Sequence, residues 1–113
     1  MRTSLMSVCA VVSATGVFAG CMAQAPEVSA ERGKELFYDA SLGGSSNSFS
    51  CAECHPGGGG IVVAGSDSDL AKVINRCIAG PLKGDGLEPE SADMRSLVLY
   101  IRSGGDSGLQ DGN

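Results

Sequence analysis

The sequence predicts an all-α fold with three main helices in one small domain. Three segments, at residues 30–38, 66–78 and 91–101, carry apolar residues at intervals of three and four, which places them on one face of a helix. No segment alternates apolar and polar residues with the period of two that is typical of a half-buried strand. A chain of 113 residues is also too short for a second lobe.

The first helix is expected over residues 30–38. Ser29 is a suitable N-cap, because its hydroxyl can accept a backbone N–H of the first turn, and Glu31 adds a negative charge where the helix dipole favours one. The apolar face of this helix consists of Gly33, Leu36, Phe37 and Ala40. Such a face requires a partner helix to cover it.

The second helix is expected to follow the Ser-Asp-Ser-Asp run at residues 66–69 and to end before Gly80 and Pro81. Its apolar face consists of Leu70, Val73, Ile74, Cys77 and Ile78. Because the core covers a face of this kind, Cys77 is predicted to be buried.

The third helix is expected to start after Ser91, another suitable N-cap, and to end at the glycines of residues 104–105. Its apolar stripe consists of Met94, Leu97, Val98 and Ile101. The tail at residues 104–113 is rich in Gly and Asp and has little to bury, so it is predicted to be disordered.

The N-terminus resembles an export signal, with Arg2 ahead of an apolar stretch at residues 5–18 that is too short to cross a bilayer as a helix. Residues 18–21 resemble a bacterial lipobox, in which Cys21 becomes the lipidated first residue. Ordinary signal cleavage after residues 23–25 is the alternative, but it would leave Pro26 first. We therefore predict a signal peptide at 1–20, a linker at 21–29, a periplasmic domain at 30–103 and a lipid anchor at a membrane surface.

The chain is acidic, with a formal net charge of −5 at pH 7. Removal of Arg2 with the signal would leave a net charge of −6. An acidic surface favours solubility, and it also favours protein partners with basic patches. Nucleic acid is not an expected partner.

The motif that carries chemistry is C-x-x-C-H at residues 51–55. Two thiols at this spacing match the two vinyl groups of one haem, and the adjacent His55 then lies at the iron as its proximal ligand. The sequence therefore predicts one covalent haem c on Cys51 and Cys54. A haem would also add apolar bulk to a domain that has 17 Gly and no Trp.

Two other site classes use the C-x-x-C spacing. A thioredoxin-like dithiol requires a βαβ context, which the helical pattern lacks. A zinc site requires further Cys or His, and the chain has one His, with Cys77 as the only other thiol after Cys21. Covalent haem is the favoured interpretation.

The residues that flank this motif resemble those of class I cytochromes c. Gly-Lys-Glu-Leu-Phe at 33–37 and Leu-Val-Leu-Tyr-Ile at 97–101 are similar to the paired terminal helices of that family, where the Gly lets the helices cross closely and aromatic rings pack at the crossing. Gly33 has no Cβ, so a second helix can approach it closely. The resemblance implies an all-α cytochrome c fold around one haem and a function in electron transfer.

The sequence does not determine which residue is the distal iron ligand. His55 is the only histidine, and the loop at residues 82–89, where class I cytochromes c usually place a Met ligand, contains none. The candidates are Cys77, an odd thiol whose alternative role is that of a small buried apolar residue, and Met94, whose position core packing also explains. A thiolate ligand would lower the reduction potential and a thioether would raise it.

Electron transfer rather than enzymatic activity is the leading prediction, because the chain contains no pattern that resembles a hydrolytic triad. Residues 74–77, followed by 82–84 and 91–94, are similar to thiosulfate dehydrogenases and related sulfur-oxidation cytochromes, some of which have a distal Cys. That similarity implies a haem subunit or enzyme of sulfur-compound oxidation as an alternative. A gas-binding haem sensor would follow if neither Cys77 nor Met94 binds iron.

Overall fold

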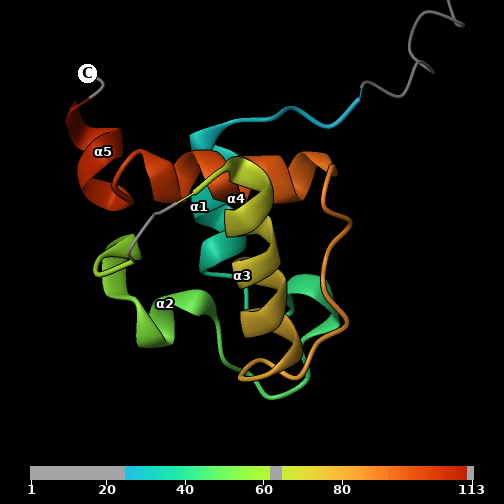
Figure 1. Ribbon diagram of the computed structural model, residues 1–113. Coiled ribbons are helices and arrows are strands. Elements are labelled where there is room, and N and C mark those ends of the chain that lie inside the picture. Colours follow the sequence, from blue (N-terminus) through green and yellow to red (C-terminus); the bar gives the residue numbers. More distant parts are fainter. Residues whose placement is uncertain (1–24, 62–64, 112–113) are drawn as a thin grey trace, which may run out of the picture.

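The computed structural model describes residues 25–61 and 65–111, and every regular element in these ranges is a helix (Figure 1). The elements are α1 (Ala30–Phe37), η2 (Leu42–Gly44), α2 (Cys51–Cys54), η3 (Pro56–Gly58), α3 (Asp67–Ala79), α4 (Ala92–Arg102) and α5 (Asp106–Asp111). The all-α prediction is confirmed. The predicted signal peptide and Cys21 lie outside the described residues. Within the described ranges, no helix is long and apolar enough to cross a bilayer.

The three main helices begin where the sequence predicts. The hydroxyls of Ser29 and Ser91 accept hydrogen bonds from the backbone N–H groups of Arg32 and Met94, in the first turns of α1 and α4. At α3, Ser66 and Asp69 form a capping box in which each side chain accepts the backbone N–H of the other residue. Short polar residues at the predicted positions therefore satisfy backbone donors that would otherwise lack partners.

The packing of α1 against α4 is the main contact between helices. The two helices approach so closely at Gly33 that a Cβ there would lie 2.0 Å from the carbonyl oxygen of Ser96 and 2.7 Å from Cβ of Tyr100. One turn further along, the rings of Phe37 and Tyr100 pack with their centroids 5.1 Å apart. The predicted role of Gly33 in a close crossing is confirmed.

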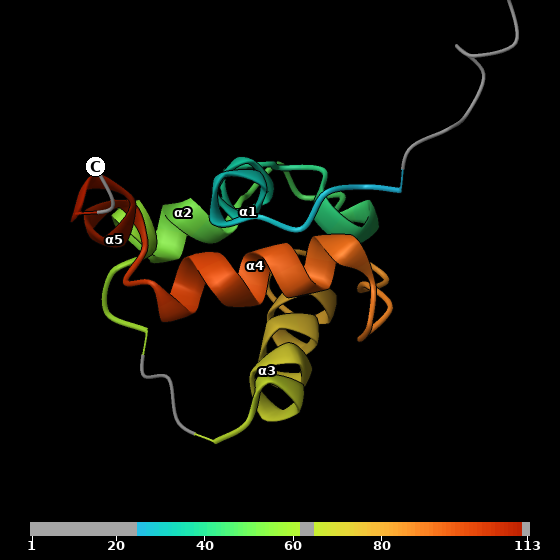
Figure 2. The ribbon, with the colours of Figure 1, turned by 90° about the horizontal axis from the view of Figure 1, so that it is seen from above.

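Seen from above, α4 lies between α1 on one side and α3 on the other (Figure 2). The buried stripe of α4 is the predicted one, together with Ser96 and Tyr100. The core also includes Leu36 and Phe37 of α1 and Leu42 of the following loop. Ala40, which was expected on the apolar face of the first helix, is exposed, because α1 ends at Phe37 and the chain turns away.

The segment between α3 and α4 is held by hydrogen bonds from both sides. Asn75 of α3 donates from Nδ2 to the carbonyl oxygen of Leu87 and accepts from the N–H of Leu87, both at 2.8 Å. The backbone N–H of Asp85 donates to the carbonyl oxygen of Gly43 at 2.7 Å. These bonds give a stretch without regular secondary structure a defined path beside α3.

Helix α5 differs from the sequence prediction, which assigned disorder to residues 104–113. Residues 106–111 are helical, and Leu109 packs against the core. The Asp106 carboxylate accepts hydrogen bonds from the hydroxyls of Tyr38 and Tyr100. The composition of the tail does not predict this helix, because the residues that stabilise it, such as Tyr38 and Tyr100, lie outside the tail.

The close crossing at Gly33 leads to a test. We expect Gly33→Ala to lower the free energy of unfolding by about 2 kcal/mol, because the added methyl group meets the backbone of α4, and this cost exceeds the helix propensity gained from Ala. Urea unfolding of the purified chain measures the change. Gly59→Ala is the matched control, because its Cβ would meet no atom closer than 3.4 Å. The control is expected to change stability by less than about 0.5 kcal/mol, and equal losses in both variants would contradict the close crossing.

Candidate functional site

The C-x-x-C-H motif forms one turn of helix followed by a sharp break. Cys51 and Cys54 are the first and last residues of α2, and His55 follows it with φ −127° and ψ 70°, outside the helical region. Pro56 explains the break, because a proline disfavours helical backbone in the residue before it. The N–H of His55 still donates to the carbonyl oxygen of Cys51 at 3.0 Å. A backbone hydrogen bond therefore fixes the positions of Cys51 and His55 relative to each other.

The turn after His55 has backbone that favours glycine. Gly57 and Gly58 have φ values of +67° and +73°, in the left-handed region. The N–H of Gly58 donates to the carbonyl oxygen of His55 at 2.9 Å. The run of glycines after the motif thus has a structural reason at these two positions.

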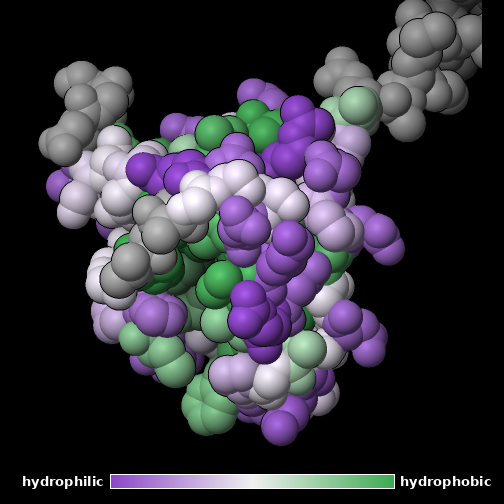
Figure 3. Space-filling model, in the orientation of Figure 1, coloured by the Kyte–Doolittle hydropathy of each residue, from purple (hydrophilic) through white to green (hydrophobic). Residues whose placement is uncertain are grey.

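A cavity of about 280 Å³ opens beside the motif. This volume is near the lower end of small-molecule sites, about 300 Å³. Cys51, Cys54 and His55 line it, and the other walls are mainly apolar side chains from α1, α3, α4 and the segment after α3. These include Phe37, Leu70, Ile74, Leu82, Leu97 and Ile101. Figure 3 shows the hollow with hydrophobic residues inside it and hydrophilic residues of α3 at its edge.

Cys77 is exposed, so the prediction that it is buried is wrong. It lies on α3 and lines the same cavity as the motif, together with Val73, which is 44% exposed. Positions 73 and 77 are one turn apart and lie at the edge of the apolar face of α3. Ile74 and Ile78 of that face are buried, whereas Val73 and Cys77 are exposed at the border of the cavity.

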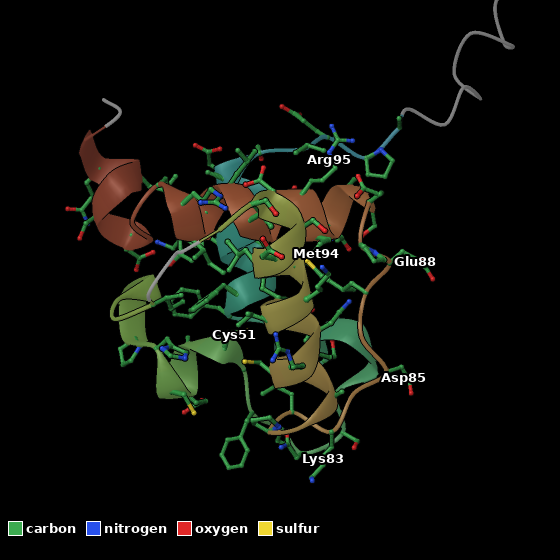
Figure 4. The ribbon with its side chains drawn as sticks, viewed as in Figure 1. Cys51, Lys83, Asp85, Glu88, Met94 and Arg95 are labelled. Atoms are coloured by element: carbon green, nitrogen blue, oxygen red, sulfur yellow. The ribbon has the colours of Figure 1, made fainter. Side chains whose placement is uncertain are left out.

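Met94 is fully buried and is not among the residues that line the cavity. It lies in the first turn of α4, where Ser91 caps the helix. In the view of Figure 4, Cys51 and Met94 lie on opposite sides of α3. Of the two distal candidates, the structure therefore brings only Cys77 to the cavity of the motif.

Burial, followed by the charges that Cys77 and Cys54 would carry as thiolates, raises the pKa of the Cys51 thiol to about 11. Cys51 is therefore protonated at neutral pH. None of the three cysteines takes part in a disulfide.

The side chains that line the cavity have the donor chemistry that a covalently attached haem would use. One imidazole and three thiols line an apolar space, and two of those thiols have the spacing of a covalent haem attachment. Comparison with family models, curated proteins and solved structures found no match to this chain. In the part of the chain that is described, no cluster of three or more His, Cys, Asp or Glu residues is placed to hold a bare metal ion.

Sequence reasoning identified the motif but missed part of its surroundings. The contribution of Phe37, Leu97 and Ile101 to the cavity was not foreseen, because their periodicity indicates only a buried face. The contact between residues 57–58 and residue 105 was also missed, since it joins positions almost fifty residues apart. The glycines at residues 57–60 and 104–105 were the sequence signal for this contact, because close backbone contacts favour residues without Cβ.

The raised pKa of Cys51 predicts how its reactivity depends on pH. In the chain with free thiols, alkylation of Cys51 is expected to speed up about tenfold per pH unit from pH 7 to 10, because the reactive thiolate increases until the pH approaches the pKa. Pulsed alkylation and peptide mass spectrometry measure the rate at each cysteine separately. A rate for Cys51 that levels off below pH 9 would contradict the burial of this thiol.

Proposed function

We propose that this protein carries one haem, covalently bound through Cys51 and Cys54 with His55 as the proximal iron ligand, and that it transfers electrons. The observation that carries the proposal is the position of the complete C-x-x-C-H motif on the wall of an apolar cavity. Within the described residues, this cavity is also the place where the thiols and the only histidine of the chain meet.

Each motif residue has a separate role in this proposal. The thiols of Cys51 and Cys54 form the covalent attachment, while the imidazole of His55 binds the iron. The group, when bound, supplies reversible one-electron chemistry at iron. The apolar side chains of α1, α3 and α4 exclude water from the site. The degree of water exclusion is one of the factors that set the reduction potential of a redox centre.

Within the all-α class, the proposed fold is that of a class I cytochrome c. The crossing of α1 and α4 at Gly33, with Phe37 packed on Tyr100, supports it, because these are the residues on which the sequence resemblance rests. The chain is proposed to act at the cell envelope, tethered through a lipid on Cys21. Its acidic charge favours redox partners with basic patches.

For the distal position we propose Cys77. Its thiol lines the cavity and is close enough to Cys51 to affect the pKa of that thiol. Met94 is enclosed by core side chains and would have to leave them to reach the cavity. A Cys ligand favours a low reduction potential. It is also the feature on which the alternative function in sulfur-compound oxidation depends.

Haem attachment is the first test. Expression in cells with a c-type haem maturation system is expected to give a protein that keeps its haem after denaturation, with a mass increase that corresponds to one haem. Cys51→Ser and Cys54→Ser should each lose one thioether bond, which shifts the reduced pyridine haemochrome band. Cys77→Ser is the control, and it should keep the wild-type band. A wild-type chain without covalent haem would refute the proposed function.

The distal ligand is the second test. Cys77→Ser is expected to change the optical and electron paramagnetic resonance spectra of the ferric protein and to raise its reduction potential, because loss of a thiolate removes stabilisation of ferric iron. Met94→Leu conserves the buried volume and should leave both measurements near the wild-type values. The opposite pattern would assign the ligand to Met94.

Carbon monoxide separates electron transfer from gas binding. A six-coordinate carrier should bind the gas slowly after reduction, because a protein ligand must first leave the iron. Fast and complete binding at low gas concentration, unchanged in Cys77→Ser, would instead favour the gas sensor.

A further inference from the structure

The Asp106 carboxylate, at the start of α5, joins three parts of the fold. It accepts hydrogen bonds from the hydroxyl of Tyr100 at 2.8 Å and from the hydroxyl of Tyr38 at 2.9 Å. The ammonium group of Lys34 lies 3.0 Å from it. Lys34 belongs to α1, Tyr38 is the residue directly after α1, and Tyr100 belongs to α4, so this one carboxylate ties both crossing helices to the start of α5.

The backbone beside Asp106 lies directly on the turn that follows His55. A Cβ on Gly105 would be 2.2 Å from the carbonyl oxygen of Gly57 and 2.9 Å from Cα of Gly58. A Cβ on Gly58 would in turn lie 3.0 Å from the ring of Tyr100. At Gly58 and Gly105, the end of α4 and the start of α5 therefore meet the turn without space for a methyl group.

Helix α5 depends on these contacts. It has six residues, and a helix of this length is not stable in water by itself. Its attachment to the domain consists mainly of Leu109, which packs against the core, and of the Asp106 carboxylate. The N–H of Leu109 also donates to the carbonyl oxygen of Gly105 at 3.3 Å. The N–H of Gly105 also donates to the carbonyl oxygen of Tyr100 at 3.0 Å. Loss of the Asp106 bonds would remove the polar side-chain ties of the segment that covers the turn.

We infer that Asp106 is a positioning residue for the proximal ligand: by holding residues 104–106 on the turn at Pro56–Gly58, it fixes the backbone that orients His55. The link to His55 is the hydrogen bond from the N–H of Gly58 to the carbonyl oxygen of His55, at 2.9 Å. The role of His55 as an iron ligand rests on the proposed function. The role of Asp106 in holding the turn rests on the contacts alone.

Asp106→Asn is the main variant, because it keeps the shape of the side chain and removes its charge. Asp93→Asn is the matched control. Asp93 also joins α1 to α4, through Arg32 at 3.3 Å, and it lies about 10 Å along α4 from Tyr100, away from the turn. Both variants remove one negative charge from an ion pair with a basic residue of α1, Lys34 for Asp106 and Arg32 for Asp93. Only the first is expected to affect His55.

Two measurements on the full haem-loaded chain test the inference. Amide hydrogen exchange at Gly58 reports whether the turn is held, and it is expected to become about fivefold faster in Asp106→Asn, the factor that corresponds to loss of one hydrogen bond. The midpoint reduction potential reports the environment of the iron, and it is expected to shift in Asp106→Asn at both low and high salt. Asp93→Asn should leave both quantities at the wild-type values.

Three outcomes would overturn the inference. Unchanged exchange at Gly58 would show that Asp106 does not hold the turn. Faster exchange with an unchanged potential would restrict Asp106 to a structural role. A potential shift that disappears at high salt would be an effect of charge, because salt screens exposed charges and leaves geometry unchanged.

Failure of the proposed function is distinguishable from these results. A wild-type chain that binds no haem refutes the ligand role of His55, while exchange at Gly58 still decides whether Asp106 holds the turn. If Asp106→Asn does not fold, Tyr38→Phe replaces it, because this change removes one of the two phenol hydrogen bonds from a ring that is 45% exposed. Tyr38→Phe should move both measurements in the same direction by a smaller amount, and no change in either would overturn the inference.

Discussion

The close crossing of α1 and α4 at Gly33 is the contact on which the rest of the domain depends. Because no Cβ separates the two helices, Phe37 and Tyr100 can pack ring against ring one turn further along. Phe37 then forms part of the cavity wall, and Tyr100 lies against Gly58 in the turn after His55. A wider crossing would therefore alter the cavity and the proximal turn together.

The candidate site combines a rigid side and an open side. The backbone around His55 is held by α2, by the left-handed glycines at 57–58 and by the end of α4. Cys77 and Val73 instead border the cavity with much of their surface exposed. Under the proposed function, this asymmetry would keep His55 in place while Cys77 stays accessible from the cavity. The sequence left three functions open, namely electron transfer, sulfur-compound oxidation and gas binding, and each proposal depends on the side of the cavity that Cys77 borders.

Asp106, which lies outside the motif, attaches the end of the chain to the two crossing helices. Its three partners, Lys34, Tyr38 and Tyr100, come from these helices or from the residue directly after α1, so the end of the chain is attached to the same contact that organises the core. The pKa of Asp106 is lowered first by its bond to Lys34, which means that the carboxylate stays charged, and the network stays intact, across the neutral range. The segment at residues 104–111, which its composition predicts to be disordered, is thus attached to the turn that follows His55.

The sequence by itself determined the three main helices, the caps of two of them at Ser29 and Ser91, the crossing at Gly33 and the C-x-x-C-H spacing of residues 51–55. These features follow from local spacing and from the properties of single residues. Only the tertiary structure decided between Cys77 and Met94 as neighbours of the motif. Helical periodicity places both on an apolar face, but it does not say whether that face meets the core or a cavity. The ordering of α5 was likewise decided by tertiary contacts, since Asp106 finds its partners up to 72 positions away in the chain.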